Sequence, residues 1–321
     1  MSKFSIGIEI GATKQQVCVA DATGAVIETI LEEISYYDAH EIIAWIEQNI
    51  NKIMTKHELI NAMISKICCG FGGPIEFDTG KVLISMQVKG WENFHLKKWL
   101  EDEFQIPALV VNDTVAGGFG ELMIGAGQKS RNFFYTNIGS GVGGALFFNR
   151  KYYDGIGRGA GYLGHTLIPD WTSKTPGAYA KLEDICSGFA IESRLQSNMY
   201  IPQNSMILDL CQNQLKNLTC KTLGDAAMAG DVFALDEVDR IAFSFGLGLS
   251  NVLTLCSLDT VVIGGGVSKI GDILIDKIIK YTNELAFISS KDHFSIFQSA
   301  LLDDAVIVGA VLLGLSDDFK V

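Results

Sequence analysis

The stretch T-N-I-G-S-G-V-G-G-A-L, residues 136–146, decides how this chain is interpreted. It follows the apolar run 133–135, which predicts a buried strand, and residues 144–148 predict a second strand that returns from the turn. A hairpin between two strands does not need four glycines, whereas a phosphate group can be bound by closely approaching backbone N–H groups. The sequence therefore favours an anion-binding turn over a purely structural one.

The same glycines match the pattern G-x-G-x-x-G between Gly139 and Gly144. In dinucleotide-binding proteins that pattern opens a helix, but here it leads into a predicted strand, so we exclude that class. A glycine hairpin that carries the hydroxyls of Thr136 and Ser140 fits the outer phosphates of ATP better.

Composition narrows the class of protein. The 321 residues are enough for about two domains, and the net charge of −12 argues against nucleic-acid and anionic membrane partners. Seven scattered cysteines without a C-x-x-C pair are typical of reduced thiols, and we expect Cys68 and Cys69 to be buried apolar side chains. No signal peptide precedes the strand 4–10, and no run approaches the about 20 apolar residues of a membrane span. We expect a cytoplasmic protein.

Two blocks of the chain each open with a strand–turn–strand unit and continue into alternating strands and helices, which predicts two similar α/β halves. In the first block we expect strands at 4–10, 15–20, 25–31, 64–69 and 108–111, and helices at 38–55, 97–104 and 114–124. In the second block we expect strands at 133–137, 144–148 and 260–263, and helices at 182–197, 225–231, 235–256 and 305–315.

Three further places could carry chemistry. The turn at Gly11–Lys14 is either a tight hairpin or a phosphate loop, and the residues alone leave this open. Asp113 follows an apolar strand, where α/β folds bind ligands, although a lone aspartate there is more often a helix N-cap. The neighbouring Asn112 can also hydrogen-bond a polyol. This brings the ligand-binding interpretation of Asp113 closer in weight to the N-cap interpretation. His165 has no cysteine cluster beside it, so we predict no zinc site.

Taken in order along nearly the whole chain, these segments resemble the ROK family (repressors, open reading frames and sugar kinases) of the actin-like, hexokinase-type ATPases. Residues 7–14, G-I-E-I-G-A-T-K, resemble its first phosphate loop, and residues 111–121, V-N-D-T-V-A-G-G-F-G-E, resemble its segment with the catalytic aspartate. Residues 136–165 resemble its second phosphate loop through to a Gly-His pair, and residues 260–268, T-V-V-I-G-G-G-V-S, resemble its adenosine-side segment.

The resemblance implies an α/β fold of two actin-like ATPase (ribonuclease H-like) domains with a cleft between them. We expect a small domain of residues 1–118, completed by the helix 305–321, and a larger domain of residues 119–304. The implied activity is that of an ATP- and Mg²⁺-dependent kinase that phosphorylates a hydroxyl of a hexose, an amino sugar or a related sugar. The family also suggests a homodimer.

The resemblance assigns roles to individual residues. Asp113 is the general base. The sugar-binding residues are Gly73, Asn112, Asp113, Tyr162, His165 and Glu183. The residues for ATP and Mg²⁺ are Glu9, Gly11, Ala12, Thr13, Lys14, Gly139, Ser140, Gly141, Gly143, Gly265 and Gly266.

Several positions depart from the family pattern. Glu9 replaces an aspartate, Ala12 a glycine, Tyr162 a glutamate and Gln87 an asparagine. Lys174, Pro176 and Lys181 stand where the family has zinc-binding cysteines, so we expect no zinc, with Trp171 and Tyr179 as candidates to hold that loop by packing.

Because these changes gather around the sugar, we expect an atypical acceptor, such as an amino, deoxy or glycosylated sugar. The alternative is a catalytically impaired sensor of sugar or nucleotide, which Glu9 and Ala12 favour. Another phosphoryl donor, such as polyphosphate, is less favoured. A polyanion needs Lys or Arg side chains along its path, and the sequence has no run of basic residues.

Overall fold

The computed structural model describes residues 4–11, 13–33, 38–85, 88–197 and 199–320, so Ala12 and Gln87 lie outside the described residues. Contacts within the chain divide it into two compact units. The first unit comprises Met1–Arg131, Ala145–Ala160 and Ala300–Val321, and the second comprises Asn132–Gly144 and Gly161–Ser299. The expected domain boundary at residues 118 and 119 stays a prediction.

The first unit is built on a five-stranded sheet in the order β3-β2-β1-β4-β7. β1, β2 and β3 form an antiparallel meander, and β4 and β7 run parallel to β1, which confirms the strands expected in this block. Their bounds are Phe4–Ile10 for β1, Lys14–Ala20 for β2, Val26–Glu33 for β3, Ile64–Phe71 for β4 and Ala108–Asn112 for β7. The registers place Ile10, Phe71 and Asn112 side by side at the carboxyl ends of β1, β4 and β7.

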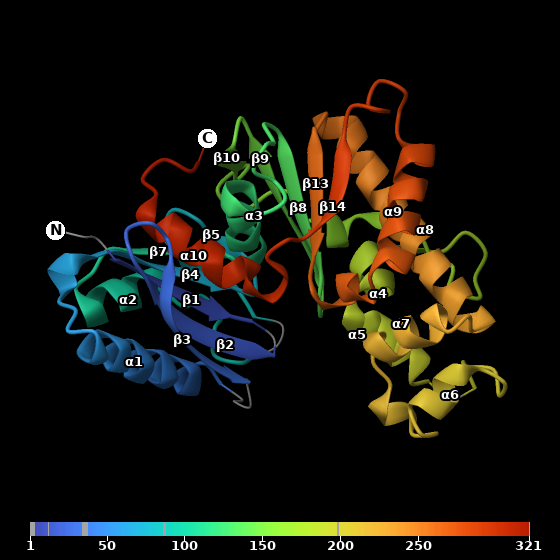
Figure 1. The fold of residues 1–321 in the computed structure, drawn as a ribbon, viewed down its shortest axis with the longest axis horizontal. Coiled ribbons are helices and arrows are strands. Elements are labelled where there is room, and N and C mark those ends of the chain that lie inside the picture. Colours follow the sequence, from blue (N-terminus) through green and yellow to red (C-terminus); the bar gives the residue numbers. More distant parts are fainter. Residues whose placement is uncertain (1–3, 12, 34–37, 86–87, 198, 321) are drawn as a thin grey trace. The chain divides into compact units, whose positions relative to one another are not determined.

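Helices cover both faces of this sheet, with α1 (Ala39–Lys56) and α2 (Leu96–Phe104) on one face and α3 (Asp113–Ile124) and α10 (Ala305–Leu315) on the other (Figure 1). Strand alternation explains this, because Val17 and Val19 belong to the core beneath α1 whereas Cys18 packs against Val311 of α10. α10 and α3 approach so closely that a Cβ on Gly309 would lie 1.7 Å from the Ala116 carbonyl oxygen.

The second five-stranded sheet has the order β10-β9-β8-β13-β14. Of its strands, β8, β13 and β14 are parallel and form the sheet of the second unit. The bounds are Phe133–Ile138 for β8, Val142–Phe148 for β9, Lys151–Tyr153 for β10, Thr260–Gly264 for β13 and Ser295–Gln298 for β14. The expected α/β class, with strand–turn–strand units followed by helices, is confirmed.

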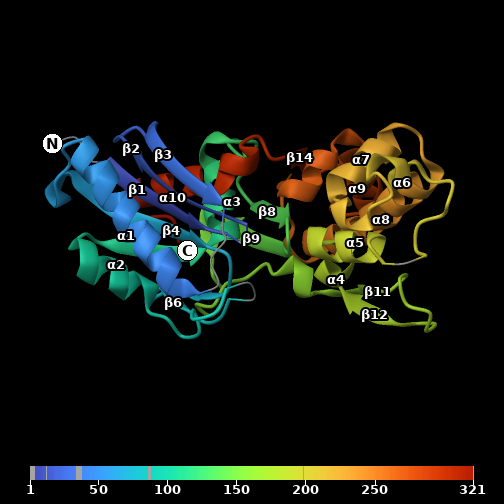
Figure 2. The same cartoon turned by 90° about the horizontal axis from the view of Figure 1, so that it is seen from below.

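The helices of the second unit pack around α8 (Val232–Cys256), which contacts α7 (Cys220–Met228) and α9 (Asp272–Leu285). The short strands β11 (Leu167–Pro169) and β12 (Tyr179–Lys181) form a hairpin in the same unit, and Figure 2 shows them side by side. In the first unit β5 (Ile75–Glu76) and β6 (Lys81–Val82) form another small hairpin. Within the described part of the chain, no helix combines the length and apolar character needed to cross a membrane.

The single helix expected over residues 182–197 is wrong, because the chain forms α4 (Leu182–Cys186) and α5 (Gly188–Leu195) with an extended Ser187 between them. The Ser187 hydroxyl accepts a hydrogen bond from the Ala190 N–H (3.2 Å) and so caps α5. The helix expected at 225–231 also begins earlier, at Cys220, because Thr219 provides a capping box with Thr222.

The adjacent cysteines of β4 confirm the expectation of buried apolar thiols. Cys68 and Cys69 are free and fully buried. Burial raises the pKa of the Cys68 thiol to about 12, so the nucleophilic thiolate is not populated at neutral pH.

Candidate functional site

Asp113 stands at the carboxyl end of β7, where the chain enters α3. The N-cap of α3 is Asn112, whose side-chain oxygen accepts a hydrogen bond from the Thr114 N–H (3.0 Å). The Asn112 amide also donates to the Gly73 carbonyl oxygen (3.0 Å) and so ties the segment after β4 to the start of α3. A lone aspartate at this place is most often the N-cap of the helix. Here Asn112 is the N-cap, and Asp113 is the first residue of α3.

The Asp113 carboxylate is enclosed by protein on most sides but keeps some exposure to solvent. Burial raises its pKa to about 6, against the opposing effect of the Thr114 N–H and hydroxyl, which donate to Oδ1 at 2.7 and 3.2 Å. A carboxylate with a pKa near neutrality is suited to accept a proton.

A second carboxylate belongs to the same edge of the sheet. Glu9 of β1 is almost fully buried, accepts a hydrogen bond from the Gln16 amide and forms an ion pair with Lys14 (3.3 Å). Burial raises the pKa of Glu9, Lys14 and Gln16 oppose that rise, and the negative charge of Asp113 adds to it. Glu9 and Asp113 therefore lie within each other's electrostatic field.

Backbone segments converge on these two carboxylates. The Gly72 N–H donates to the Ile10 carbonyl oxygen (2.8 Å), and the Gly11 N–H donates to that of Lys14 (3.0 Å). A Cβ on Gly72 would lie 3.6 Å from both Asp113 Oδ2 and Gly11 Cα. The first unit thus brings together Gly11, Lys14, Gly73, Asn112 and Asp113, and Thr13 lies exposed in the same turn.

The glycines of the turn between β8 and β9 and of the first residues of β9 are of two kinds. A Cβ on Gly144 would lie 2.1 Å from the Gly161 carbonyl oxygen, so packing alone requires glycine there. A Cβ on Gly139 would meet no described atom within 4 Å, and one on Gly141 would approach only the Glu183 carboxylate, at 3.1 Å. Packing between described residues therefore does not explain Gly139, and the space beside its Cα is open to a ligand.

Side chains of β8 hold this turn in place. The Thr136 hydroxyl is buried and donates to the Gly143 carbonyl oxygen (2.6 Å), and Asn137 Oδ1 accepts a hydrogen bond from the Gly143 N–H (2.8 Å). The hydroxyl of Thr136 therefore shapes the turn, whereas Ser140 is partly exposed at its tip.

Sequence reasoning missed a contact that supports the same turn. The Gly188 N–H at the start of α5 donates to the Gly139 carbonyl oxygen (2.7 Å). A Cβ on Gly188 would lie 3.0 Å from that oxygen, so glycine allows the close approach. The Ser-Gly pair at 187–188 was the available signal, because serine is a common helix cap and glycine disfavours a helix interior.

The glycines after β13 also differ from each other. Gly265 has a φ of 86° and a Cβ there would lie 2.5 Å from the Ile138 carbonyl oxygen, so its glycine is structural. Gly266 has open space where a Cβ would point and begins a 3₁₀ helix that ends at Ile270.

The remaining residues expected to bind sugar gather in the second unit. His165 Nε2 lies 3.6 Å from Glu183 Oε1, and the Tyr162 ring meets His165 edge-on at 6.3 Å between centroids. Glu183 Oε2 accepts a hydrogen bond from the Val142 N–H at 3.4 Å, which links this group to the glycine turn. The expected sugar-binding residues thus form two groups, one in each unit.

Trp171 holds the loop where the family resemblance would place zinc. Its indole N–H donates to the Ser244 hydroxyl (2.9 Å), and the guanidinium groups of Arg194 and Arg240 lie over its ring at 4.8 and 5.4 Å. Tyr179 does not share this role, because its side chain is 70% exposed. Among the described residues, no three His, Cys, Asp or Glu side chains are grouped to hold a metal ion.

The comparison with protein families matches this chain to the ROK family over residues 5–316. The chain belongs to the ROK family. Its relatives include a glucokinase of Halalkalibacterium halodurans, which is 29% identical over 310 residues and is matched over 96% of this chain and 93% of that protein.

Relatives of two kinds occur. A ROK family glucokinase from Streptomyces griseus, solved in complex with glucose and AMPPNP, is 25% identical with a TM-score of 0.81 over 97% of this chain and 98% of that one. A xylose repressor of Caldicellulosiruptor bescii is 25% identical over 326 residues, covering 97% of this chain and 78% of that protein. The actin-like ATPase fold that the sequence implied is thus confirmed.

The buried charge of Asp113 leads to a prediction about stability. Its folded-state pKa of about 6 lies above its ordinary value of 3.8, so ionisation at pH 7 costs folding free energy. Asp113→Asn removes that cost, and we expect the free energy of unfolding at pH 7 to rise by on the order of 1 kcal/mol, reduced by the partial exposure. The gain should shrink as the pH falls from 7 through 6 towards 4, because wild-type Asp113 then becomes neutral in the folded state.

Urea unfolding at several pH values measures this difference. Asp102→Asn is the matched control, because it makes the same change at an exposed aspartate of α2. A variant Asp113→Asn that is less stable than wild type at pH 7 would contradict the assignment of a costly buried charge.

Proposed function

We propose that this ROK protein is an ATP- and Mg²⁺-dependent kinase that phosphorylates a hydroxyl of a hexose, an amino sugar or a related sugar. We place it in the cytoplasm and expect a homodimer. The observation that carries the proposal is the enclosed carboxylate of Asp113, which has a pKa near neutrality at the carboxyl end of a parallel strand. The glucokinases among its relatives support the same reaction class.

Asp113 acts as the general base in this proposal. It accepts the proton of the sugar hydroxyl as the hydroxyl oxygen bonds to the terminal phosphorus of ATP and the bond from that phosphorus to ADP breaks. Asn112 fixes the backbone on either side of the base through its bonds to Thr114 and Gly73, and with Gly73 it lies beside the sugar.

Backbone groups of the glycine turn would hold the nucleotide. The N–H groups of Ser140 and Gly141 would bind the phosphates, because the Gly139 N–H donates to the Gly141 carbonyl oxygen (2.9 Å) and the Gly143 N–H to Asn137 Oδ1 (2.8 Å). The open positions at Gly139 and Gly266 would let the ligand approach the backbone. Gly11, Thr13 and Lys14 would supply a second set of phosphate contacts, and Gly265 and Gly266 would supply the contacts to the nucleoside.

The residues present fit a divalent cation beside the phosphates. Glu9 is a buried carboxylate with a raised pKa, and its environment gains from a positive charge that also offsets the field of Asp113. A bound Mg²⁺ would neutralise charge that develops on the phosphates.

The sugar side departs from the family pattern at Tyr162. Its ring packs edge-on against His165, which in turn lies beside Glu183, so an aromatic edge replaces a charged acceptor. We therefore propose an acceptor less hydrophilic than glucose at one position, such as an amino, deoxy or glycosylated sugar.

A variant of the base tests the mechanism. Asp113→Asn should lower kcat by about 10²- to 10⁴-fold because a positioned base typically contributes that much, while sugar binding is retained. In the wild type, kcat/KM should fall about tenfold per pH unit below pH 6, where Asp113 becomes protonated.

ADP release in a coupled assay measures the kcat of Asp113→Asn and the pH dependence of kcat/KM in the wild type, with Asp102→Asn as the control. Retained turnover in Asp113→Asn would remove Asp113 from the role of base.

A methyl group in the glycine turn tests the nucleotide site. Because a Cβ on Gly139 meets no described atom within 4 Å, Gly139→Ala should leave the melting temperature unchanged. The same methyl group would occupy space proposed for a phosphate, so we expect the KM for ATP to rise about tenfold or more, which corresponds to roughly 1.4 kcal/mol of binding. An unchanged KM for ATP would place the phosphates elsewhere.

A second candidate function is a sugar or nucleotide sensor without catalysis. The xylose repressor among the relatives and Glu9 in place of the family's aspartate favour it. The two candidates separate in a panel of sugars with ATP–Mg²⁺, in which ADP release is compared with a no-sugar control and sugar binding is followed by calorimetry. The kinase releases ADP with at least one sugar, most with a sugar less hydrophilic than glucose. Binding without ADP release would establish the sensor, and glucose or N-acetylmannosamine as the best acceptor would contradict the proposed substrate class.

A further inference from the structure

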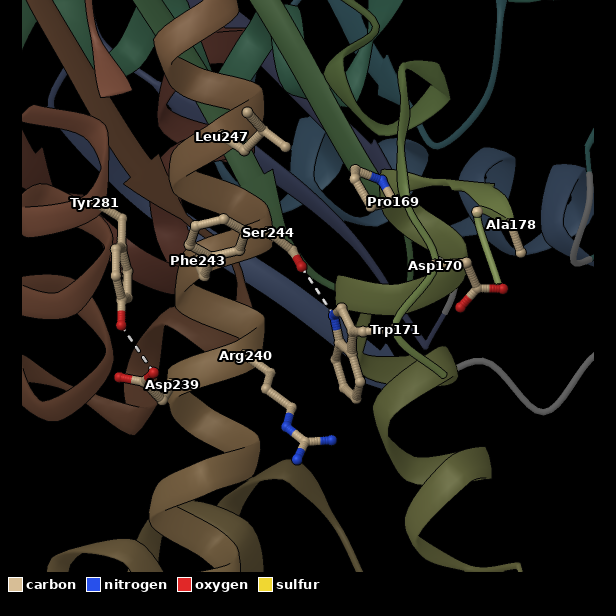
Figure 3. A pocket seen from close by; sticks show the side chains of 11 residues that line it. Pro169, Asp170, Trp171, Ala178, Asp239, Arg240, Phe243, Ser244, Leu247 and Tyr281 are labelled. Carbon is tan, nitrogen blue, oxygen red and sulfur yellow. Dashed lines mark hydrogen bonds between the residues drawn. The ribbon is translucent and has the colours of Figure 1, made fainter. Parts of the chain in front are cut away.

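A groove of about 370 Å³ lies within the second unit. Its floor is one face of α8, formed at spacings of three and four residues by Arg240, Phe243, Ser244 and Leu247. Tyr281 of α9 borders one side of this face and Trp171 of the β11–β12 loop the other (Figure 3).

The floor and walls of the groove are mainly aromatic and apolar. Phe243 is 41% exposed although its ring meets Tyr281 edge-on at 5.3 Å between centroids. An exposed phenylalanine in a concave surface gains free energy when a ring of a ligand covers it. A hollow of this size is within the usual range for small-molecule sites.

Most polar groups of the groove are already paired within the protein. Asp239 accepts hydrogen bonds from Lys277 and from the Tyr281 hydroxyl (2.8 Å). Asp170 accepts from the backbone N–H and the hydroxyl of Thr172 at 2.9 and 2.6 Å, and in the view of Figure 3 its carboxylate points away from α8. The Asp170 carboxylate therefore stabilises its own loop, and the Asp239 carboxylate joins α8 to α9. Neither is placed to bind a cation in the groove.

Arg240 differs from these groups. Its guanidinium has five N–H donors, and its ion pair with Asp236 (2.7 Å) joins two side chains that are each about half exposed. Such exposed pairs contribute little free energy, so an anionic ligand can share or replace Asp236. The groove thus offers an aromatic floor with one cation at its edge.

We propose that this groove binds a small molecule that carries an aromatic ring and one anionic group. The ring covers Phe243 between Tyr281 and Trp171, and the anion binds the Arg240 guanidinium.

The position of the groove makes it an effector site. Its loop residues lie at the tip of the β11–β12 hairpin, where the Asp170 N–H donates to the Ala178 carbonyl oxygen (2.8 Å). The other end of the same hairpin carries His165 and Glu183, and the Leu182 N–H donates there to the Thr166 carbonyl oxygen (2.9 Å). A ligand that fixes the tip of the hairpin restricts the residues at its base, so sugar and effector affinities should be coupled reciprocally. This coupling rests on the proposed function, whereas the binding of the ring and the anion does not.

The probe is 1-anilinonaphthalene-8-sulfonate, which has aromatic rings and one sulfonate, and its matched control is N-phenyl-1-naphthylamine, which lacks the sulfonate. Fluorescence titration of the full chain should show one saturable site for the sulfonate and at least tenfold weaker binding of the uncharged compound. Arg240→Gln should weaken the sulfonate about tenfold and leave the uncharged compound unchanged, and Ala178→Trp should abolish binding of both by filling the groove. Arg158→Gln, which changes an exposed arginine of the first unit, should have no effect.

Equal binding of the two compounds, or an unchanged affinity in Ala178→Trp, overturns the proposal. Ultracentrifugation adds a further test, because an altered oligomeric state in both groove variants would make the groove an interface between copies of the chain. Calorimetry with the best sugar measures the coupling, and saturating sulfonate should change its dissociation constant at least twofold in the wild type but not in Ala178→Trp. Sulfonate binding without that change overturns the effector role, whereas sulfonate binding in a protein that phosphorylates no sugar contradicts only the proposed function.

Discussion

A carboxylate that is enclosed at the end of a strand is the constraint on which the rest of the first unit depends. Its ionisation is costly, so the fold must hold it without neutralising it. Asn112 supports this carboxylate, because it shares the Thr114 N–H with Asp113 as the cap of α3 and ties the neighbouring backbone to Gly73. The result is a carboxylate whose proton affinity is set by burial and by Thr114.

Glycines serve two different purposes in the second unit. The sequence does not distinguish the two kinds of glycine, but the structure does. Gly144 and Gly265 are required by close backbone contacts, whereas Gly139 and Gly266 face open space. The buried hydroxyl of Thr136 and the backbone of Gly188 hold the turn in place, so the N–H groups of the partly exposed Ser140 and Gly141 are preorganised. Preorganised donors of this kind stabilise charge without having to reorganise during a reaction.

Much of the fold could be predicted from the sequence, because strand alternation and helical spacing are local signals. The meander of β1, β2 and β3 follows from alternation and turn residues, and α1 follows from its apolar spacing and its Asp38 cap. The break at Ser187 was missed, because apolar spacing continues through it and the reason for the break is a contact with Gly139, far away in the sequence. The same holds for Thr136, whose hydroxyl looked available in the sequence but is committed to Gly143. Candidate site residues were found where family motifs gave a pattern, whereas the α8 groove has no sequence motif because it depends on α9 and a loop meeting one helix face.

The late position of α10 has a consequence for the synthesis of the protein. Val311 and Ile307 of this helix complete the core on one face of the first sheet, where they pack with Cys18 and Ala20 of β2. Because Gly309 fits tightly against Ala116, another segment of the chain cannot easily take the place of α10 on this face. While the ribosome is still translating the middle of the chain, that face of the nascent sheet is uncovered and apolar. Chaperones that bind exposed apolar surface are thus expected to engage this protein until residues 305–315 have emerged.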